Sequence, residues 1–316
     1  MTRYLIRRLL LLLPVLLGVT VMSYFIITLA PGDPVDLLID PNMTAADKEI
    51  KRHALGLDQP VIVQYGQWLW QLLHGNLGYS FATYQSVGLR IAERIGPTLL
   101  LSGTALLIAY LLAIPLGIVS ARRQYSWVDY GATVFALLGV SLPSFFVGLL
   151  GIWLFSLRLN WLPTGNMITV PGGGGVVDVV THLVMPAAVL SLATLGSEIR
   201  YVRSSMLDVI QQDYIRTARA KGLAEQTITY RHALRNALIP VITLAGLQLP
   251  FLLGGAVVTE QVFRWPGMGL LTIEAINSRD YPTLMGINLI AAIMVMLGNL
   301  LADIAYSLAD PRIRYD

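Results

Sequence analysis

QQDYIRTARAKGLAEQTITYRHALRNALIP, residues 211–240, is a polar and basic stretch between two segments apolar enough to cross a bilayer. Asp213 suits an N-cap and Gly222 suits the C′ position, so we expect a short helix over residues 214–221. A helix of about eight residues is too short to be stable alone in water. It must therefore pack on another part of the protein or bind a partner.

The predicted short helix mixes small, apolar and basic side chains. The small ones are Ala218 and Ala220, the apolar ones Tyr214 and Ile215, and the basic ones Arg216, Arg219 and Lys221. Its residues alone leave two interpretations open, a docking element for a partner and an amphipathic connector lying on the membrane surface. A second helix is expected over residues 225–235, because that segment is acidic at its start and basic at its end.

The composition indicates an integral membrane protein. The chain has 316 residues, of which 55% are hydrophobic and 13% charged, and this charged content is about half that of an average soluble domain. Six windows without Asp, Glu, Lys or Arg are long enough to cross about 30 Å of hydrocarbon as a helix. They are residues 9–32, 95–121, 130–157, 179–197, 236–259 and 281–302. We therefore expect an all-α membrane protein with six transmembrane helices, the first retained rather than cleaved.

Two further windows without charged residues are not expected to span. In residues 59–89, Gln64, Gln67 and Gln71 make one face polar, which predicts an interfacial amphipathic helix followed by a loop. Residues 159–177 contain several prolines and glycines. Irregular backbone in contact with lipid would leave its amides unpaired, so this window is expected to be a loop.

Arginine and lysine predict the orientation. If the N-terminus is cytoplasmic, the short outside loops hold only Arg158, Arg264 and Arg279, whereas most other basic residues fall inside. Both termini and residues 211–240 are therefore expected to be cytoplasmic. The net charge of +3 follows from this asymmetry and does not indicate nucleic-acid binding.

The chain divides into four predicted regions. They are an N-terminal transmembrane helix (1–30), an extracytoplasmic loop with an amphipathic helix (31–94), a five-helix core (95–307) that includes a cytoplasmic loop (208–240), and a cytoplasmic tail (308–316). We interpret the region 31–94 as a cap on the membrane surface without chemistry of its own.

The motifs of several enzyme classes are absent from the sequence. It contains no GxxxxGK[ST] phosphate loop, no HExxH and no GxSxG. It also contains no cysteine, which excludes disulfides and thiolate metal sites. We therefore expect no catalytic residue, no cofactor and no metal ligand on this chain.

A few polar residues fall within or beside the predicted spans. Gln248 and Asn288 are candidates for the lining of a path, although polar groups in spans also face neighbouring helices. Glu198 and Arg200 are expected at the headgroup boundary, where charge costs little.

Several separate blocks resemble one transporter family. DYIRTARAKG followed by HALRNALIPVIT is similar to the EAA loop of ABC-importer permeases of the dipeptide and oligopeptide type. The resemblance continues in YLIRRLLLLLPVLLG, APGDP, RYVRSSMLDVI, VTEQVFRWPGMG, RDYP and NLLADIAYSLADPRIRY, and it is greatest to the B-type permease. Thr217-Ala218-Arg219 stands where the wider family often has Glu-Ala-Ala, which is typical of the peptide branch.

The resemblance implies a type I importer permease fold, also called MetI-like, in the bacterial cytoplasmic (inner) membrane. It implies a heterodimer with a homologous second permease, two cytoplasmic ABC ATPases that hold ATP and Mg, and an extracytoplasmic substrate-binding protein. The short helix would be the coupling helix that contacts an ATPase, through Asp213, Tyr214, Ile215, Arg216, Thr217, Ala218, Arg219, Ala220, Lys221 and Gly222.

The loop before the last predicted span is a second candidate site. We expect a turn at 265–269 and a short helix over 270–278, with the loop contacting the binding protein or gating the path. Its candidate residues are Phe263, Arg264, Trp265, Pro266 and Gly267.

The function expected from this resemblance is import of di- and oligopeptides, with this chain forming half of the path. Nickel, glutathione and opine permeases share the pattern, so these substrates remain alternatives. A stand-alone ion-coupled transporter is another, although Glu198, Glu260 and Asp303 fall near span ends rather than at the bilayer centre. A membrane scaffold or sensor that recruits a soluble partner is the third.

Overall fold

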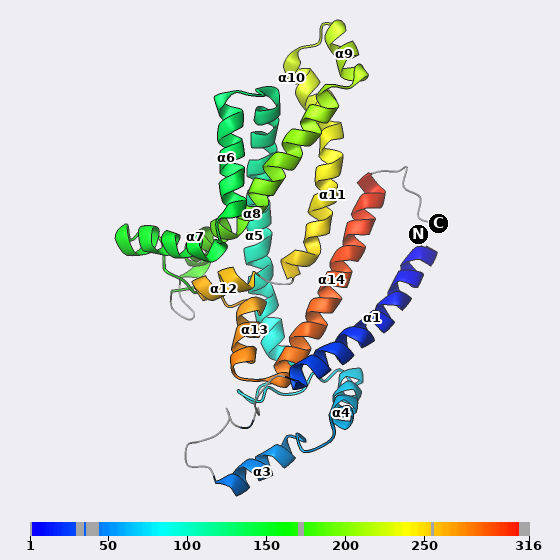
Figure 1. Cartoon of the computed structure of the whole chain (residues 1–316), viewed down its shortest axis with the longest axis vertical. Helices are drawn as coiled ribbons and strands as arrows, with labels where there is room; N and C mark the ends of the chain where they lie inside the picture. Colours follow the sequence, from blue (N-terminus) through cyan, green and yellow to red (C-terminus); the bar gives the residue numbers. More distant parts are fainter. Residues whose placement is uncertain (1, 30–34, 36–43, 170–173, 254–255, 310–316) are drawn as a thin grey trace.

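The computed structural model describes residues 2–29, 35, 44–169, 174–253 and 256–309. Apart from one β-bridge between Tyr79 and Ser86, the regular structure of these residues is helical. Figure 1 shows an elongated bundle with α9 (Asp213–Ala220) and α10 (Glu225–Thr227) at one end and α3 (Ala45–Ala54) and α4 (Val61–Leu73) at the other. The candidate helix α9 and the predicted cap of residues 31–94 therefore lie at opposite ends of the molecule.

Four described helices are long and apolar enough to cross a membrane. They are α1 (Thr2–Thr28), α5 (Val87–Arg122), α8 (Gly175–Ile210) and α14 (Tyr281–Ala309). A bent helix pair would make a fifth span. An all-helical membrane fold is thus found, whereas the count of six and the cytoplasmic placement of both ends stay predictions. Of the predicted tail, residues 308 and 309 belong to α14, and residues 310–316 lie outside the described part.

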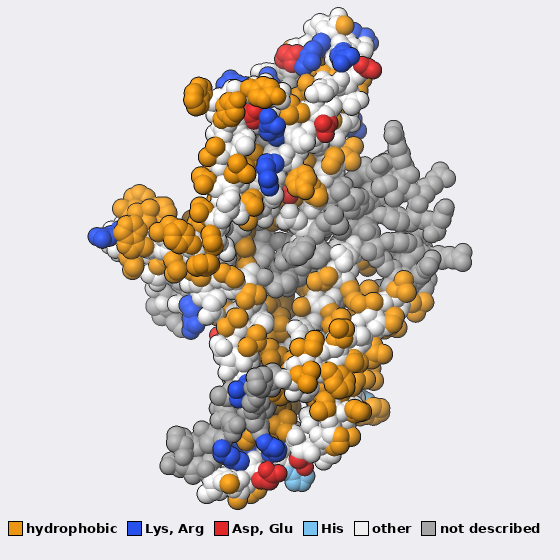
Figure 2. Space-filling model, in the orientation of Figure 1, with side chains coloured by type: hydrophobic (Ala, Val, Ile, Leu, Met, Phe, Trp, Pro, Cys, Tyr) orange, Lys and Arg blue, Asp and Glu red, His pale blue; other side chains and the backbone are white. Residues whose placement is uncertain are grey.

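The span expected over residues 130–157 is not one straight helix, and its crossing of the membrane stays a prediction. Two segments replace it, α6 (Trp127–Ser141) and then α7 (Ser144–Gly151) with the π-helix η1 (Ile152–Arg158), and they are bent by 101°. Leu142, the residue before Pro143, has extended backbone (φ −81°, ψ 129°), which the proline ring favours. The α7 arm projects from the bundle and carries a dense hydrophobic surface (Figures 1 and 2).

The sequence predicted a helix over 225–235 that ends before the next span, but the structure shows no break between them. Helix α10, the π-helix η2 (Ile228–Ala233) and α11 (Leu234–Leu253) follow one another without a break. The segment expected to reach residue 259 ends earlier as regular helix, because α12 (Val257–Phe263) is a separate element. Residues 254–255, between α11 and α12, lie outside the described part.

Helices α6 and α8 cross with their backbones in contact. A Cβ on Gly139 would lie 2.7 Å from the carbonyl oxygen of Leu192, and one on Gly196 would lie 2.4 Å from that of Ala136. Small residues let membrane helices approach this closely. A cluster of buried alanines, Ala109, Ala113, Ala132 and Ala136, continues the contact to α5.

Helix α4 packs on α1 at the opposite end. The Tyr65 ring lies 5.4 Å from that of Tyr24 and 6.1 Å from that of Trp68, measured between centroids. Irregular backbone follows α4 as far as Ser86, so the helix and loop expected in residues 59–89 are confirmed.

The loop after α4 is fixed to the start of α14 by the buried carboxylate of Asp280. This carboxylate accepts hydrogen bonds from Ser80, from the Phe81 N–H at 2.9 Å and from Arg90 at 3.0 Å. The loop therefore has a defined position relative to α14.

The α6–α8 crossing predicts different effects for two glycines of one helix. Gly139→Ala should destabilise the protein by roughly 1–3 kcal/mol, because the new methyl group collides with backbone. Gly131→Ala meets nothing within 4 Å and should be neutral or stabilising by up to about 1 kcal/mol. Thermal unfolding of both variants in detergent measures this difference. Equal melting temperatures would show that the crossing is looser than described.

Candidate functional site

The short helix of the opening stretch is present, one residue earlier than expected. Helix α9 runs from Asp213 to Ala220. Gln212, with extended backbone and no side-chain cap bond, is its N-cap, so the assignment of Asp213 as N-cap is wrong. Asp213 is instead the first helical residue, where a negative charge still interacts favourably with the helix dipole.

The C-terminal end of α9 is closed by the glycine turn expected there. Gly222 has φ +76°. Its N–H donates to the Arg219 carbonyl at 2.9 Å, and the Leu223 N–H donates to the Ala218 carbonyl at 3.4 Å. These two bonds form a Schellman motif, which requires the left-handed residue. A Cβ at Gly222 would meet nothing within 4 Å, so backbone conformation alone restricts this position.

One face of α9 packs on the ends of the long helices. Ile215 is fully buried and Ala218 is 7% exposed. They belong to one hydrophobic cluster with Ile118 and Ala121 of α5, Val202 and Met206 of α8, Ile228 and Ala233 of η2, and Ala237 and Val241 of α11. We call this set the platform. Burial of an Ile side chain contributes about 1.5–3 kcal/mol to stability. This contribution helps to stabilise a helix that is too short to form alone in water.

The other face of α9 is exposed, and the Tyr214 hydroxyl on it accepts a hydrogen bond from Asn236 Nδ2 at 2.8 Å. Its exposed residues are Asp213, Tyr214, Arg216, Thr217, Arg219, Ala220, Lys221 and Gly222. The charged side chains on the visible face of the molecule gather mainly around α9 and at the opposite end (Figure 2). The ion pairs Arg216–Asp213 (3.3 Å) and Arg219–Glu225 (2.8 Å) are exposed, so they add little stability and can exchange for contacts with a partner. The arrangement suits docking and holds no catalytic constellation.

A partly buried ion pair near the platform was not identified from the sequence. Arg203 of α8 donates from Nε and Nη2 to the two carboxylate oxygens of Asp129, at 2.6 and 2.8 Å. Ser120 and the Tyr125 N–H donate to the same carboxylate. The pair fixes the α5–α6 turn to α8. Its sequence signal is weak, because only the Ser126-x-x-Asp129 cap spacing marks the carboxylate.

Glu198 is buried within the bundle, and its position at the headgroup boundary stays a prediction. It is 1% exposed, and its Oε1 accepts a hydrogen bond from Gln248 Nε2 at 3.0 Å. Its Oε2 has no hydrogen-bond partner among the described residues. Gln248 thus contacts a neighbouring helix here, and Asn288 is half-buried on α14. Their assignment to a path stays a prediction.

The loop before α14 has a buried and an exposed part. Phe263 and Trp265 are 1% and 0% exposed, and Trp265 Nε1 donates to the Pro97 carbonyl at 2.9 Å. Arg264 is exposed with left-handed backbone (φ 51°), Pro266 is half-buried and Gly267 is buried. Contact with a binding protein stays a prediction. Of the five candidate residues, Arg264 is the one whose side chain is exposed and could make this contact. The short helix expected here is α13 (Met268–Asn277), two residues earlier than predicted.

Glu260 explains the glycines of this loop. Its fully buried carboxylate accepts from Thr98 Oγ1 and from the Leu270 N–H, both at 2.9 Å. A Cβ on Gly267 would lie 2.3 Å from this carboxylate. Glu260 therefore caps the N-terminus of α13 from another helix, a role that we did not predict from the sequence.

Comparison with protein families gives two matches that together cover most of the chain. Residues 113–315 match the model described as "Binding-protein-dependent transport system inner membrane component". Residues 1–102 match the model for the N-terminal part of such membrane components.

Individual relatives match along their whole length. A putative peptide permease protein of Brucella suis biovar 1 (strain 1330) is 47% identical over 99% of both chains. An oligopeptide transport system permease protein of Bacillus subtilis (strain 168) is 45% identical over all of both chains. A glutathione transport system permease protein of Salmonella choleraesuis (strain SC-B67) is 39% identical over all of both chains.

A solved structure with a similar fold is that of the MetNI methionine ABC transporter in inward-facing conformations. The TM-score is 0.55 at 14% identity, with 70% of this chain and 96% of that chain covered. This likeness shows the fold, and the MetI-like architecture expected from the sequence is confirmed.

The bidentate pair beside the platform predicts that arginine at position 203 cannot be replaced by lysine. Arg203→Lys should lower the free energy of unfolding by about 1–3 kcal/mol, because an ammonium group cannot make the two parallel bonds. Arg200→Lys, on an exposed position of the same helix, is the control and should have little effect. Chemical denaturation of the two purified variants makes the comparison, and equal losses would contradict a special role for the pair.

Proposed function

The chain belongs to the family of binding-protein-dependent transport system inner membrane components, and from this premise we propose that it is a permease subunit of an ATP-driven importer of di- and oligopeptides. It forms half of the translocation path. It performs no chemistry itself, and its work is to convert a movement at α9 into a change of access between its long helices.

The observation that carries the proposal is the way α9 is mounted. Its inner face is fixed to α5, α8 and α11 through the platform, while its outer face stays exposed. A partner that binds the outer face and moves therefore moves the ends of three long helices together. This is what a coupling helix requires, and residues 213–222 are proposed as the contact with an ATPase subunit.

The proposed assembly supplies what this chain lacks. Two cytoplasmic ATPases bind ATP and Mg, a homologous second permease completes the path as a heterodimer, and an extracytoplasmic binding protein delivers the substrate. In this arrangement the α9 end faces the cytoplasm of a bacterial cell and the α4 end faces outward. The separation of α9 from α4 along the bundle supports this assignment (Figure 1).

Peptides are the proposed substrate because full-length relatives carry peptide and oligopeptide permease names. The relative named for glutathione agrees with this class, since glutathione is itself a short peptide. Nickel and opines are the substrates to exclude.

Isolation of the complex tests the proposal. A tag on this chain should co-purify a second permease and ATPase subunits from the native membrane. After reconstitution into vesicles, uptake of a labelled tripeptide should require ATP and the binding protein and should not respond to ionophores. Uptake driven by a proton gradient without ATP would instead indicate a secondary transporter, and partner binding without any uptake would indicate a scaffold.

The left-handed turn at Gly222 predicts a graded series of variants in the same vesicles. Gly222→Val places a β-branched residue where φ is +76°, at a cost of about 1–2 kcal/mol or more. It should lower uptake and ATPase stimulation by roughly tenfold or more while membrane insertion stays normal. Gly222→Asn, which tolerates this backbone, should keep most of the activity. Full activity of the valine variant would overturn the requirement for the turn.

A further inference from the structure

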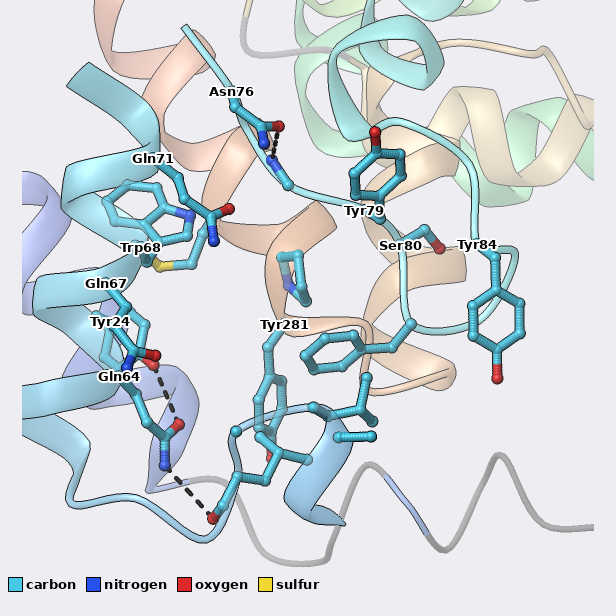
Figure 3. A pocket seen from close by; sticks show the side chains of 18 residues that line it. Tyr24, Gln64, Gln67, Trp68, Gln71, Asn76, Tyr79, Ser80, Tyr84 and Tyr281 are labelled. Carbon is cyan, nitrogen blue, oxygen red and sulfur yellow. Dashed lines mark hydrogen bonds between the residues drawn. The ribbon is translucent and has the colours of Figure 1, made fainter. Parts of the chain in front are cut away.

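A cavity of about 400 Å³ opens at the end of the molecule opposite α9. Helix α1, the α3–α4 turn, one face of α4, the loop over residues 76–84 and the first turn of α14 form its walls (Figure 3). Its volume lies in the range of sites that bind small molecules. This is the region that the sequence led us to interpret as a cap without chemistry.

The lining of the cavity is aromatic and polar but uncharged. Six of its residues are aromatic and four carry primary amides, and none is Asp, Glu, Lys, Arg or His. Gln64, Gln67 and Gln71 recur at intervals that place them on one face of α4. A ligand with a net charge at the contact would find no counter-charge, so the bound part of a ligand must be neutral.

Part of this polar lining is already engaged. Gln64 accepts from the Tyr24 hydroxyl at 3.2 Å and donates to the Gln59 carbonyl at 2.7 Å, and Asn76 accepts from the Gly78 N–H at 2.9 Å. These residues shape the wall. The side chains of Gln67 and Gln71, in contrast, have no hydrogen bond to a described residue, and both are exposed at the cavity.

Trp68 lies between these two glutamines and supplies an independent observation. It is 9% exposed and lines the cavity, yet its indole Nε1 has no hydrogen-bond partner among the described residues. A buried donor without a partner is costly. This nitrogen has almost no accessible surface, so an acceptor from a ligand in the cavity can satisfy it only after the Trp68 side chain shifts.

The spacing of the free groups favours extended peptide main chain over other neutral ligands. Gln67 and Gln71 are four residues apart on α4, so their Cβ atoms are about 5–6 Å apart. Along an extended chain, peptide groups that point the same way repeat every second residue, about 6.6–7 Å. Two primary amides, each able to donate and accept, can therefore bond to successive outward-facing peptide groups, while aromatic faces contact the side chains.

Resting on the proposed import of peptides, we propose that this cavity binds a short, extended and uncharged stretch of peptide main chain. Gln67 and Gln71 bond to its peptide groups, and a shift of the Trp68 side chain lets Nε1 donate to one of its carbonyls. Such contacts do not read side chains, so the site accepts many sequences. It holds the substrate on the outer face of the permease before the substrate enters the path.

The absence of cysteine from the chain allows a clean proximity test in the reconstituted complex without ATP. Ala54→Cys places a thiol at the cavity without removing a proposed contact, and Ile62→Cys places one on the opposite, 74% exposed face of α4. Bromoacetyl-trialanine amide and bromoacetamide are compared as alkylating reagents, with modification of this chain read by mass spectrometry. The peptide reagent should be favoured on the order of tenfold, equivalent to 1.4 kcal/mol, at residue 54 and not at residue 62.

Competition identifies the ligand class. Acetyl-trialanine amide should protect the thiol at residue 54, and Gln67→Ala, Gln71→Ala and Trp68→Phe should each weaken this protection, whereas Gln59→Ala, outside the cavity lining, should not. Equal reagent preference at residues 62 and 54 would overturn the proposal, and so would protection by maltose instead of the peptide.

The two proposals fail separately. Peptide protection without ATP-dependent peptide uptake would refute the importer and retain the cavity as a peptide site. Uptake without protection would refute the cavity and retain the importer.

Discussion

An eight-residue helix cannot hold its own shape in water, and the architecture at one end of this molecule follows from that constraint. The platform stabilises this helix, because apolar side chains from α5, α8, η2 and α11 pack against Ile215 and Ala218. The same contact that stabilises α9 also joins the ends of α5, α8 and α11. Stability of the small element and its mechanical connection to the large ones are therefore one interaction.

Buried acidic side chains connect the rest of the bundle. Asp129 pairs with Arg203, Glu198 bonds to Gln248, Glu260 bonds to Thr98 and α13, and Asp280 bonds to Arg90 and the loop after α4. Each contact joins segments that are distant in sequence. A buried polar contact loses much of its energy when its partner moves away, so these four contacts favour concerted displacement of helices over local distortion.

Apolar windows, turn chemistry and ordered family blocks predicted the helical membrane fold, the short helix and the turn at Gly222. These signals did not predict the features that depend on which helices are neighbours in the fold. Pro143 was visible in the sequence, but proline is tolerated within spans, and only the structure shows a 101° bend there. Glu198 and Glu260 sat near predicted span ends, yet they are buried because neighbouring helices cover them. For Glu260, the closely spaced Gly267 and Gly269 were the available signal.

Glycine marks two unrelated constraints in this protein. At Gly222 the constraint is chirality, since φ is +76° and nothing lies within 4 Å of a Cβ; a D-residue, whose favoured backbone has this hand, satisfies it. At Gly139 the constraint is volume, because any L side chain meets the Leu192 carbonyl. The requirement at Gly222 is local, so it would persist if a short segment containing this turn were grafted into another bundle. The second exists only while two particular helices remain neighbours.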